Sequence, residues 1–189
     1  MKFYECQKGS VVHTITLINF GNQFMDSVKI KPRLTPQQAR PKIEKYCSYQ
    51  ERSQWQVRKK LMDYGLSALD ADMMLVELIR DNFINEERFT RAFVFGKFKT
   101  KGWGKKKIQQ GLMAVGVNEK LILRILTELP AEDYSDKLEI IAQKKWRLIK
   151  GSTIYERQVK LQRFLLGRGY DMDAVISIAK QISASSADE

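Results

Sequence analysis

The chain has 189 residues, of which 43% are hydrophobic and 29% are charged, proportions typical of a folded protein rather than a disordered one. Its 33 basic and 22 acidic residues give a formal net charge of +11, which favours an anionic partner over a merely solubilising surface. No run approaches the roughly 20 consecutive apolar residues of a membrane span, so the sequence predicts a soluble protein.

The first 33 residues do not share the pattern of the rest of the chain. The segment from Val11 to Ile18 is rich in β-branched residues and could form a short strand, but no partner strand is evident. No small-residue cleavage site follows it, so it does not resemble a signal peptide. We therefore expect residues 1–33 to be a weakly ordered N-terminal extension, and whether residues 1–24 belong to the native protein stays open.

Three glycines spaced by 51 and 53 residues mark an internal repeat: Gly65, Gly116 and Gly169. Each has a leucine four residues before it and a helix-capping residue two after it, namely Ser67, Asn118 and Asp171. Apolar residues recur at helical spacing on both sides of each glycine. Because glycine adopts the left-handed conformation without steric cost, each is predicted to end one helix before the next begins.

A further helix is predicted ahead of each of these pairs, over residues 37–48, 86–98 and 133–148. The sequence therefore predicts an all-α fold of three tandem three-helix repeats, at residues 34–84, 85–132 and 133–182, with a frayed tail at 183–189. Because repeats bury their faces mainly against their neighbours, we expect an elongated, curved array. A single compact nine-helix globule is the alternative.

Residues suited to catalysis or metal binding are sparse. The single His13 and the distant Cys6 and Cys47 cannot form a structural zinc site or a disulfide framework, which indicates a reducing compartment, the cytoplasm. No serine lies in a strand–turn–helix frame. The G-x-G at residues 102–104 lacks the preceding strand and the spacing of a P-loop. We therefore predict no cofactor, no metal and no enzymatic activity.

The most basic stretch of the chain runs from Arg91 to Lys107, with seven basic residues and no acidic one. Because such a run repels itself, we expect something anionic to face it. Trp103 lies in the loop within the run, where it could contact a partner, stack on a base or cover a junction between repeats. A weaker cluster lies at Arg52 and Arg58 to Lys60, although each cation taken singly suits a solvated surface.

Several landmarks resemble the RecX family of recombination regulators, over about Leu34 to Ile182. In chain order they are Glu51-Arg52-Ser53 before the helix that ends at Gly65, Phe83-Ile84-Asn85 with Arg88-Phe89, Lys101-Gly102-Trp103-Gly104, and Arg168-Gly169-Tyr170. Their order and spacing carry the resemblance, since no single landmark is specific. Asn85-Glu86 stands where an aspartate pair is expected, and Thr90 where alanine is usual.

This resemblance implies a monomeric, non-enzymatic regulator whose partner is the filament of the RecA recombinase, with single-stranded DNA within or beside it and no membrane. Binding along the filament groove or at its end would limit strand exchange and the filament's stimulation of repressor self-cleavage. The residues expected to contact the filament are Arg52, Lys59, Lys60, Lys97, Lys99, Lys101, Trp103, Lys105, Lys106, Lys107 and Arg163.

Two other functions stay open on the sequence alone. A basic helical protein that binds DNA without RecA would suit the charge and the recurring helix pairs. The helix after each glycine is apolar-rich, however, and carries few cations in two of the repeats, unlike a recognition helix. A scaffold for acidic protein partners is the second alternative.

Overall fold

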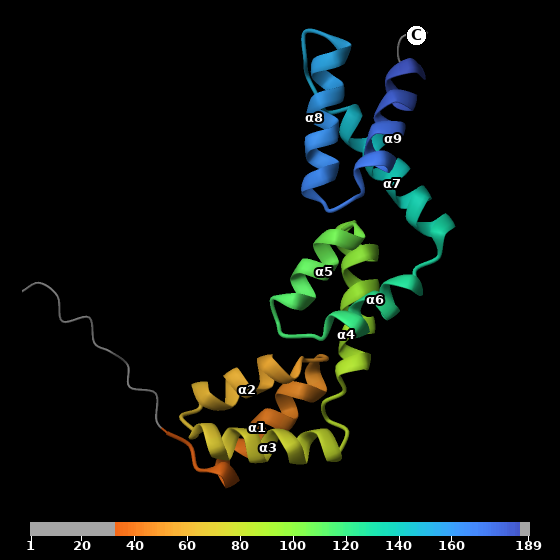
Figure 1. Cartoon of the computed structure of the whole chain (residues 1–189). Helices are drawn as coiled ribbons and strands as arrows, with labels where there is room; N and C mark the ends of the chain where they lie inside the picture. Colours follow the sequence, from red (N-terminus) through yellow and green to blue (C-terminus); the bar gives the residue numbers. More distant parts are fainter. Residues whose placement is uncertain (1–32, 186–189) are drawn as a thin grey trace, which may run out of the picture. The chain divides into compact units, whose positions relative to one another are not determined.

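A computed structural model describes residues 33–185, which form nine α-helices and one π-helix and contain no strand (Figure 1). The elements are α1 (Pro36–Tyr49), α2 (Gln54–Asp63), α3 (Ala68–Arg80), α4 (Glu86–Gly96), η1 (Lys97–Lys101), α5 (Lys105–Met113), α6 (Glu119–Thr127), α7 (Ala131–Trp146), α8 (Ile154–Gly167) and α9 (Met172–Ser185). The predicted all-α fold is confirmed. The expectations for residues 1–32, including the possible strand, lie outside the described residues.

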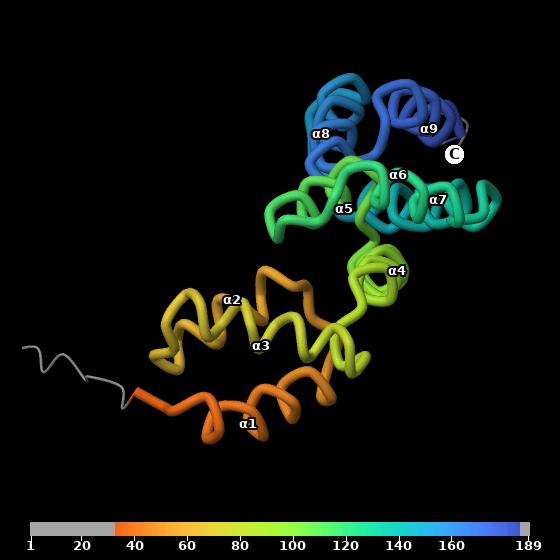
Figure 2. Tube along the Cα trace, turned by 60° about the horizontal axis from the view of Figure 1, so that its bottom comes forward, coloured from red at the N-terminus to blue at the C-terminus, as the bar shows by residue number. Residues whose placement is uncertain are grey.

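Three successive groups of three helices each enclose a hydrophobic core of their own. The leucine four residues before each glycine is completely buried in its core: Leu61, Leu112 and Leu165. Burying one such side chain contributes about 1.5–3 kcal/mol, so these positions are major contributors to stability. Within the groups α2 packs beside α3 and α8 beside α9, as Figure 2 shows. The shared apolar frame of the sequence is thus the shared core of the fold.

The glycine turn after the middle helix is the same in all three groups. Gly65, Gly116 and Gly169 have φ angles of +90°, +77° and +84°, which confirms the predicted left-handed helix ends. In each turn the N–H after the glycine donates to the carbonyl of the buried leucine, over 3.3, 3.2 and 3.3 Å. This pattern is the Schellman motif, which satisfies carbonyls that the helix end leaves without a partner.

The carbonyl that precedes each glycine accepts a hydrogen bond from a residue earlier in the chain. Within the first group, the Tyr64 carbonyl accepts from the Leu34 N–H at 2.9 Å. The other two bonds join successive groups. The Val115 carbonyl accepts from the Ser53 hydroxyl at 3.3 Å. The Arg168 carbonyl accepts from the Gly104 N–H at 2.7 Å. Since Ser53 and Gly104 precede the first residues of α2 and α5, the start of one middle helix rests on the glycine turn of the next.

The glycine-rich segment around Gly104 could be a flexible turn by its composition, but Gly102 and Gly104 are buried and tightly packed. A Cβ atom at Gly104 would overlap the backbone carbonyl group of Gly169, and one at Gly102 would overlap the side chain of Ile141. Both glycines therefore allow a close approach between the second and third groups of helices. Tertiary contacts therefore fix this loop in place.

Several helix boundaries differ from those predicted: α1 extends one residue further at each end, and α7 ends at Trp146, two residues earlier than expected. The helix expected to continue to Phe98 gives way at Lys97 to the π-helix η1, and α7 begins at Ala131, two residues earlier than expected. The last helix, α9, continues to Ser185, so residues 183–185 are helical rather than part of a frayed tail. The physical reason is the burial of Ser183, whose hydroxyl accepts a hydrogen bond from Gln158 of α8.

Cys47 should be chemically inert in the folded protein. Burial in the first core raises the pKa of its thiol to about 11. Because the thiolate is the reactive form, the thiol stays protonated and unreactive until the pH approaches that value. In a Cys6→Ser variant, which leaves Cys47 as the one thiol of the chain, we expect a thiol reagent such as DTNB to react slowly with the folded protein near neutral pH and rapidly in urea. Fast reaction of the folded variant would contradict this assignment.

Candidate functional site

The basic run from Arg91 to Lys107 spans the end of α4, the π-helix η1 and the start of α5. The π-helix ends at Lys101, and the next residue, Gly102, has a φ of +59° that turns the chain toward α5. Short π-helices are rare and occur frequently at functional sites. The segment therefore combines an unusual backbone with a concentration of positive charge.

Two cations of this run have counter-charges, which corrects the expectation that all seven are uncompensated. Arg91 pairs with Glu87 at 3.2 Å and with Glu128 at 2.7 Å, and these carboxylates raise the pKa of its guanidinium. Lys106 pairs with Asp171 at 3.3 Å. These carboxylates lie outside the run and are brought to it by the fold, so the run itself does not reveal them.

The three consecutive lysines at the start of α5 face the third group of helices. The Lys105 N–H donates to the Tyr134 hydroxyl at 3.3 Å, and the Lys105 ammonium lies 5.0 Å from the centre of that ring. The Lys107 ammonium donates to the Gly167 carbonyl at 2.9 Å. With Lys106 paired to Asp171, all three contribute to packing between groups. Reversing their charge would therefore disturb the fold as well as any binding surface.

Trp103 is half-buried and belongs to the second core. Its ring meets Phe93 edge-on, with 6.4 Å between the ring centres. The ammonium groups of Lys97 and Lys107 each lie 5.2 Å from the centre of the Trp103 ring, within the range of a cation–π interaction. Trp103 thus covers a junction, which is one of the three roles that the sequence leaves open, while its exposed part lies among cations.

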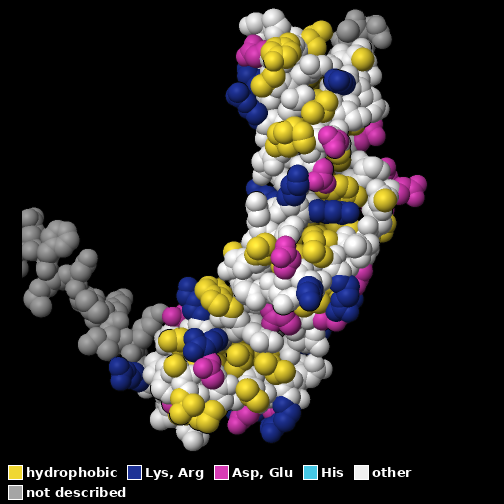
Figure 3. Space-filling model, viewed as in Figure 1, with side chains coloured by type: hydrophobic (Ala, Val, Ile, Leu, Met, Phe, Trp, Pro, Cys, Tyr) yellow, Lys and Arg dark blue, Asp and Glu magenta, His cyan; other side chains and the backbone are white. Residues whose placement is uncertain are grey.

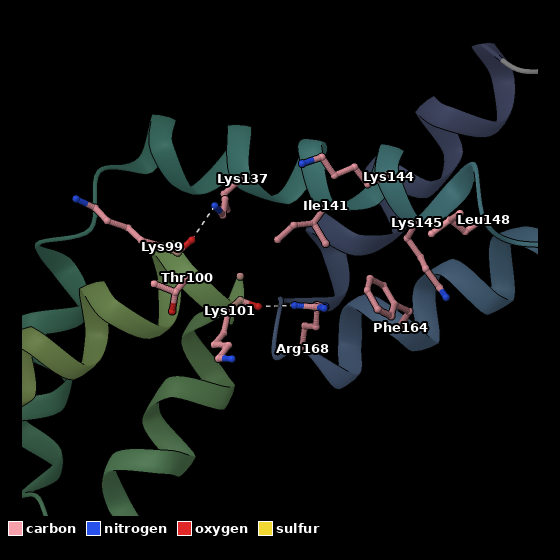
Figure 4. A pocket seen from close by; sticks show the side chains of 11 residues that line it. Lys99, Thr100, Lys101, Lys137, Ile141, Lys144, Lys145, Leu148, Phe164 and Arg168 are labelled. Atoms are coloured by element: carbon pink, nitrogen blue, oxygen red, sulfur yellow. Dashed lines mark hydrogen bonds between the residues drawn. The ribbon is translucent and has the colours of Figure 1, made fainter.

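The fold gathers four of the predicted contact residues around one hollow of about 480 Å³ between the η1–α5 segment and α8. They are Lys101, Trp103, Lys107 and Arg163. Lys101 also lines an adjoining cavity of about 450 Å³, which we call the basic pocket (Figure 4). Phe164 and Arg168 line both cavities, so the two form a continuous hollowed surface.

The basic pocket lies between η1, α7 and α8, and six of its side chains are cationic: Lys99, Lys101, Lys137, Lys144, Lys145 and Arg168. Its other lining residues are Thr100, Gly102, Ile141, Leu148 and Phe164, so none of the described residues that line it is acidic. The six cations form no ion pair with any residue of the range 33–185. Unneutralised positive charge is therefore concentrated here.

Two of these cations hold the pocket together. The Lys137 ammonium donates to the Lys99 carbonyl at 3.0 Å, and the Arg168 guanidinium donates to the Lys101 carbonyl, as the dashed lines of Figure 4 show. Both carbonyls belong to the π-helix, so α7 and α8 fix its end in place. Charge-assisted bonds of this kind are stronger than neutral ones. The ammonium groups of Lys101 and Lys144 make no such bond within the described chain.

None of the pocket's four cations from α7 and the end of α8 belongs to the predicted set. On α7, Lys144 and Lys145 follow Lys137 by seven and eight residues, a spacing of about two helical turns that places all three on one helix face. That periodicity is visible in the sequence and could have identified them. Arg168 directly precedes Gly169, and no such periodicity in the sequence marks it as a pocket residue.

The remaining predicted residues lie elsewhere. Arg52 and Lys97 line a separate cavity of about 410 Å³, and the Arg52 guanidinium lies 4.2 Å from the centre of the Tyr46 ring. On α2, Lys59 lies over Trp55, and Lys60 lies over Tyr64. On the face seen in Figure 3, basic and acidic side chains alternate with hydrophobic ones, so net charge alone does not mark a site. The predicted residues therefore form at least two surfaces.

Comparisons with known proteins agree with this architecture. The second and third three-helix domains of RecX match residues 85–125 and 132–178. The regulatory protein RecX of Clostridium beijerinckii is 30% identical over 149 residues, which cover 78% of this chain and 67% of that protein. The RecX of Clostridium perfringens (strain 13 / Type A) is 30% identical over 131 residues, 68% of this chain and 60% of that protein, so the chain spans about two thirds or less of these relatives.

A solved structure shows the same fold. The crystal structure of RecX from Lactobacillus salivarius superimposes with a TM-score of 0.69 at 20% identity, covering 79% of this chain and 97% of that one. Within the part of the chain that the structure describes, no helix is long and apolar enough to cross a membrane. The same part holds no group of three or more side chains suited to a metal ion.

Proposed function

Because the chain belongs to the RecX family of regulatory proteins, we propose that it binds filaments of the RecA recombinase and restrains their activity. Bound along the filament, it would lower ATP hydrolysis, strand exchange and the stimulation of repressor cleavage. It would act as a monomer in the cytoplasm, without a cofactor and without catalysing a reaction itself.

The observation that carries the proposal is the concentration of unpaired cations between the second and third groups of helices. Six cations without a neighbouring carboxylate among the described residues of the basic pocket produce a strongly positive potential. Such a potential accelerates encounter with a negatively charged surface and orients the two partners. A filament of protein on DNA offers both acidic side chains and phosphates to this surface.

In the first and last groups, the third helix gives little support to the rival function of autonomous sequence-specific DNA binding. Among described residues, α9 contains one basic residue, Lys180, and α3 contains one, Arg80. A recognition helix needs several polar and basic side chains that reach base edges and phosphates. DNA contact, if made, would therefore depend on charge rather than on base sequence.

Co-sedimentation tests the proposal against its alternatives. We expect the chain to sediment with RecA filaments formed on single-stranded DNA, and to bind the same DNA without RecA at least about tenfold more weakly, a difference of about 1.4 kcal/mol. Binding should weaken as salt is raised, because screening acts on exposed charges. Equal binding to bare DNA would indicate an autonomous DNA-binding protein, and failure to bind the filament at low salt would reject the proposed function.

A further inference from the structure

We propose that the basic pocket is a docking site for a peptide segment that combines acidic residues with an apolar side chain. The inference rests on the proposed function only in that the filament protein would carry such a segment. It specifies that the pocket recognises both negative charge and an apolar side chain, whereas a generally basic surface would recognise negative charge alone.

The charge of the pocket requires an anionic occupant. Lys144 is exposed, and neither it nor Lys101 has a counter-ion or a hydrogen-bond partner for its ammonium among residues 33–185. Lys137 and Arg168 add two more positive charges that are directed toward backbone carbonyls. Such a group of like charges is destabilising until carboxylates or phosphates approach it.

The floor of the pocket adds an apolar requirement. Ile141 of α7 and Phe164 of α8 face the same space in Figure 4, and Leu148 at the rim is 75% exposed. Because Ile141, Leu148 and Phe164 line one cavity together, they form an apolar surface among the lysines that suits contact with an apolar group of a partner. Inorganic phosphate or a bare sugar–phosphate backbone would neutralise the cations but leave these three side chains uncovered.

A peptide fits these features better than a nucleic acid base does. The Arg168 guanidinium and the Lys145 ammonium lie 4.7 and 5.0 Å from the centre of the Phe164 ring. A base that stacked on Phe164 would have to compete with these cations for the ring, whereas an aliphatic side chain can lie against Ile141 and Leu148. The volume of about 450 Å³ falls within the range of ordinary ligand pockets and accommodates a side chain with its flanking backbone.

The pocket is also preorganised. The hydrogen bonds from Lys137 and Arg168 to carbonyls of η1 join its three walls, and Gly102 packs against Ile141 at its base. A site that is already in its binding geometry spends less free energy on ordering when a ligand enters. We therefore expect binding without a large rearrangement of α7 or α8.

Fluorescence anisotropy with labelled synthetic peptides tests the inference. The probes are a short glutamate-rich peptide containing leucine and phenylalanine, the same peptide with both apolar residues changed to serine, and an oligothymidylate of similar charge. The full chain should bind the apolar-containing peptide about tenfold or more tightly than the serine peptide, equivalent to about 1.4 kcal/mol. It should also bind that peptide more tightly than the oligothymidylate.

Variants assign the binding to the pocket. Lys144→Gln with Lys145→Gln should weaken both peptides about tenfold or more, as expected when two charge contacts are removed. Leu148→Ser should reduce the preference for the apolar peptide while leaving the serine peptide unaffected. The matched control is Lys42→Gln with Lys45→Gln, which removes the same charge from α1, where the structure shows no ion pair for either lysine. This control should leave both affinities unchanged.

Three results would overturn the inference. One is tighter binding of the oligothymidylate than of either peptide, and another is equal affinity for the two peptides. The third is an equal loss in the pocket and control variants, which would show an effect of net charge alone. If the chain still sediments with RecA filaments in any of these cases, the peptide inference fails while the proposed function stands.

Discussion

Replacing Gly169 with alanine should lower the free energy of unfolding by about 2–5 kcal/mol, because two separate costs add at this position. The φ of +84° lies in the left-handed region, which costs an alanine about 1–2 kcal/mol. A Cβ atom would also overlap the backbone of Lys107, so the second and third groups of helices would have to move apart. Overpacking of this kind adds about 1–3 kcal/mol.

Gly116→Ala provides the matched control for this prediction. Gly116 has a similar φ of +77°, but its added Cβ would meet nothing closer than the Cβ of Trp55 at 3.7 Å, an ordinary contact. We therefore expect it to cost only the conformational term of about 1–2 kcal/mol. Urea denaturation of the two variants measures the difference. Equal losses would show that the close approach at Gly169 contributes nothing to stability.

Leu112→Ala should lower the free energy of unfolding by about 2–5 kcal/mol through the cavity it leaves in the second core. Leu112 is completely buried between α5, α4 and α6, and it also closes the glycine turn through its carbonyl. Since Ile108, Ile122 and Ile125 of the same core are themselves completely buried, they have little freedom to fill the space.

The adjacent residue on α5 supplies the control for Leu112. Met113 is 52% exposed, and Met113→Ala should change stability by no more than about 0.5 kcal/mol, as surface substitutions usually do. Thermal unfolding followed by circular dichroism measures both variants. If the Leu112→Ala variant unfolds at the same midpoint temperature as the parent chain, Leu112 is not a core residue.

The fold could be predicted from the sequence because its determinants are local and repeated. One local pattern recurs three times: a left-handed glycine, a leucine four residues before it and a capping residue two after it. Each occurrence supports the interpretation of the others. The π-helix η1 could not be predicted in this way. Its end is held by Lys137 and Arg168, which reach its carbonyls from helices distant in the sequence.

The candidate site was predictable only in part, for a similar reason. The sequence shows where cations are dense but not which of them have partners. Arg91 meets Glu128 only because α4 packs against α6, and Lys106 meets Asp171 only because successive groups dock. Conversely, Lys144 and Lys145 are ordinary helix residues in the sequence, and become part of a site only when α7 lies beside η1 and α8. Predicting which cations stay unpaired thus requires the tertiary structure.

The most direct test of the account is the inhibition of RecA's DNA-dependent ATP hydrolysis by a pocket variant and a charge-matched control. The pocket variant changes four lysines to glutamine: Lys99, Lys101, Lys144 and Lys145. The control changes four exposed lysines outside the pocket: Lys42, Lys45, Lys120 and Lys180. Both lose the same charge, so general electrostatic effects cancel. We expect the pocket variant to keep its helical content but to lose most of its inhibition of ATP hydrolysis, and the control to inhibit like the parent chain. Equal inhibition by the two variants would contradict the assignment of the basic pocket as the binding site.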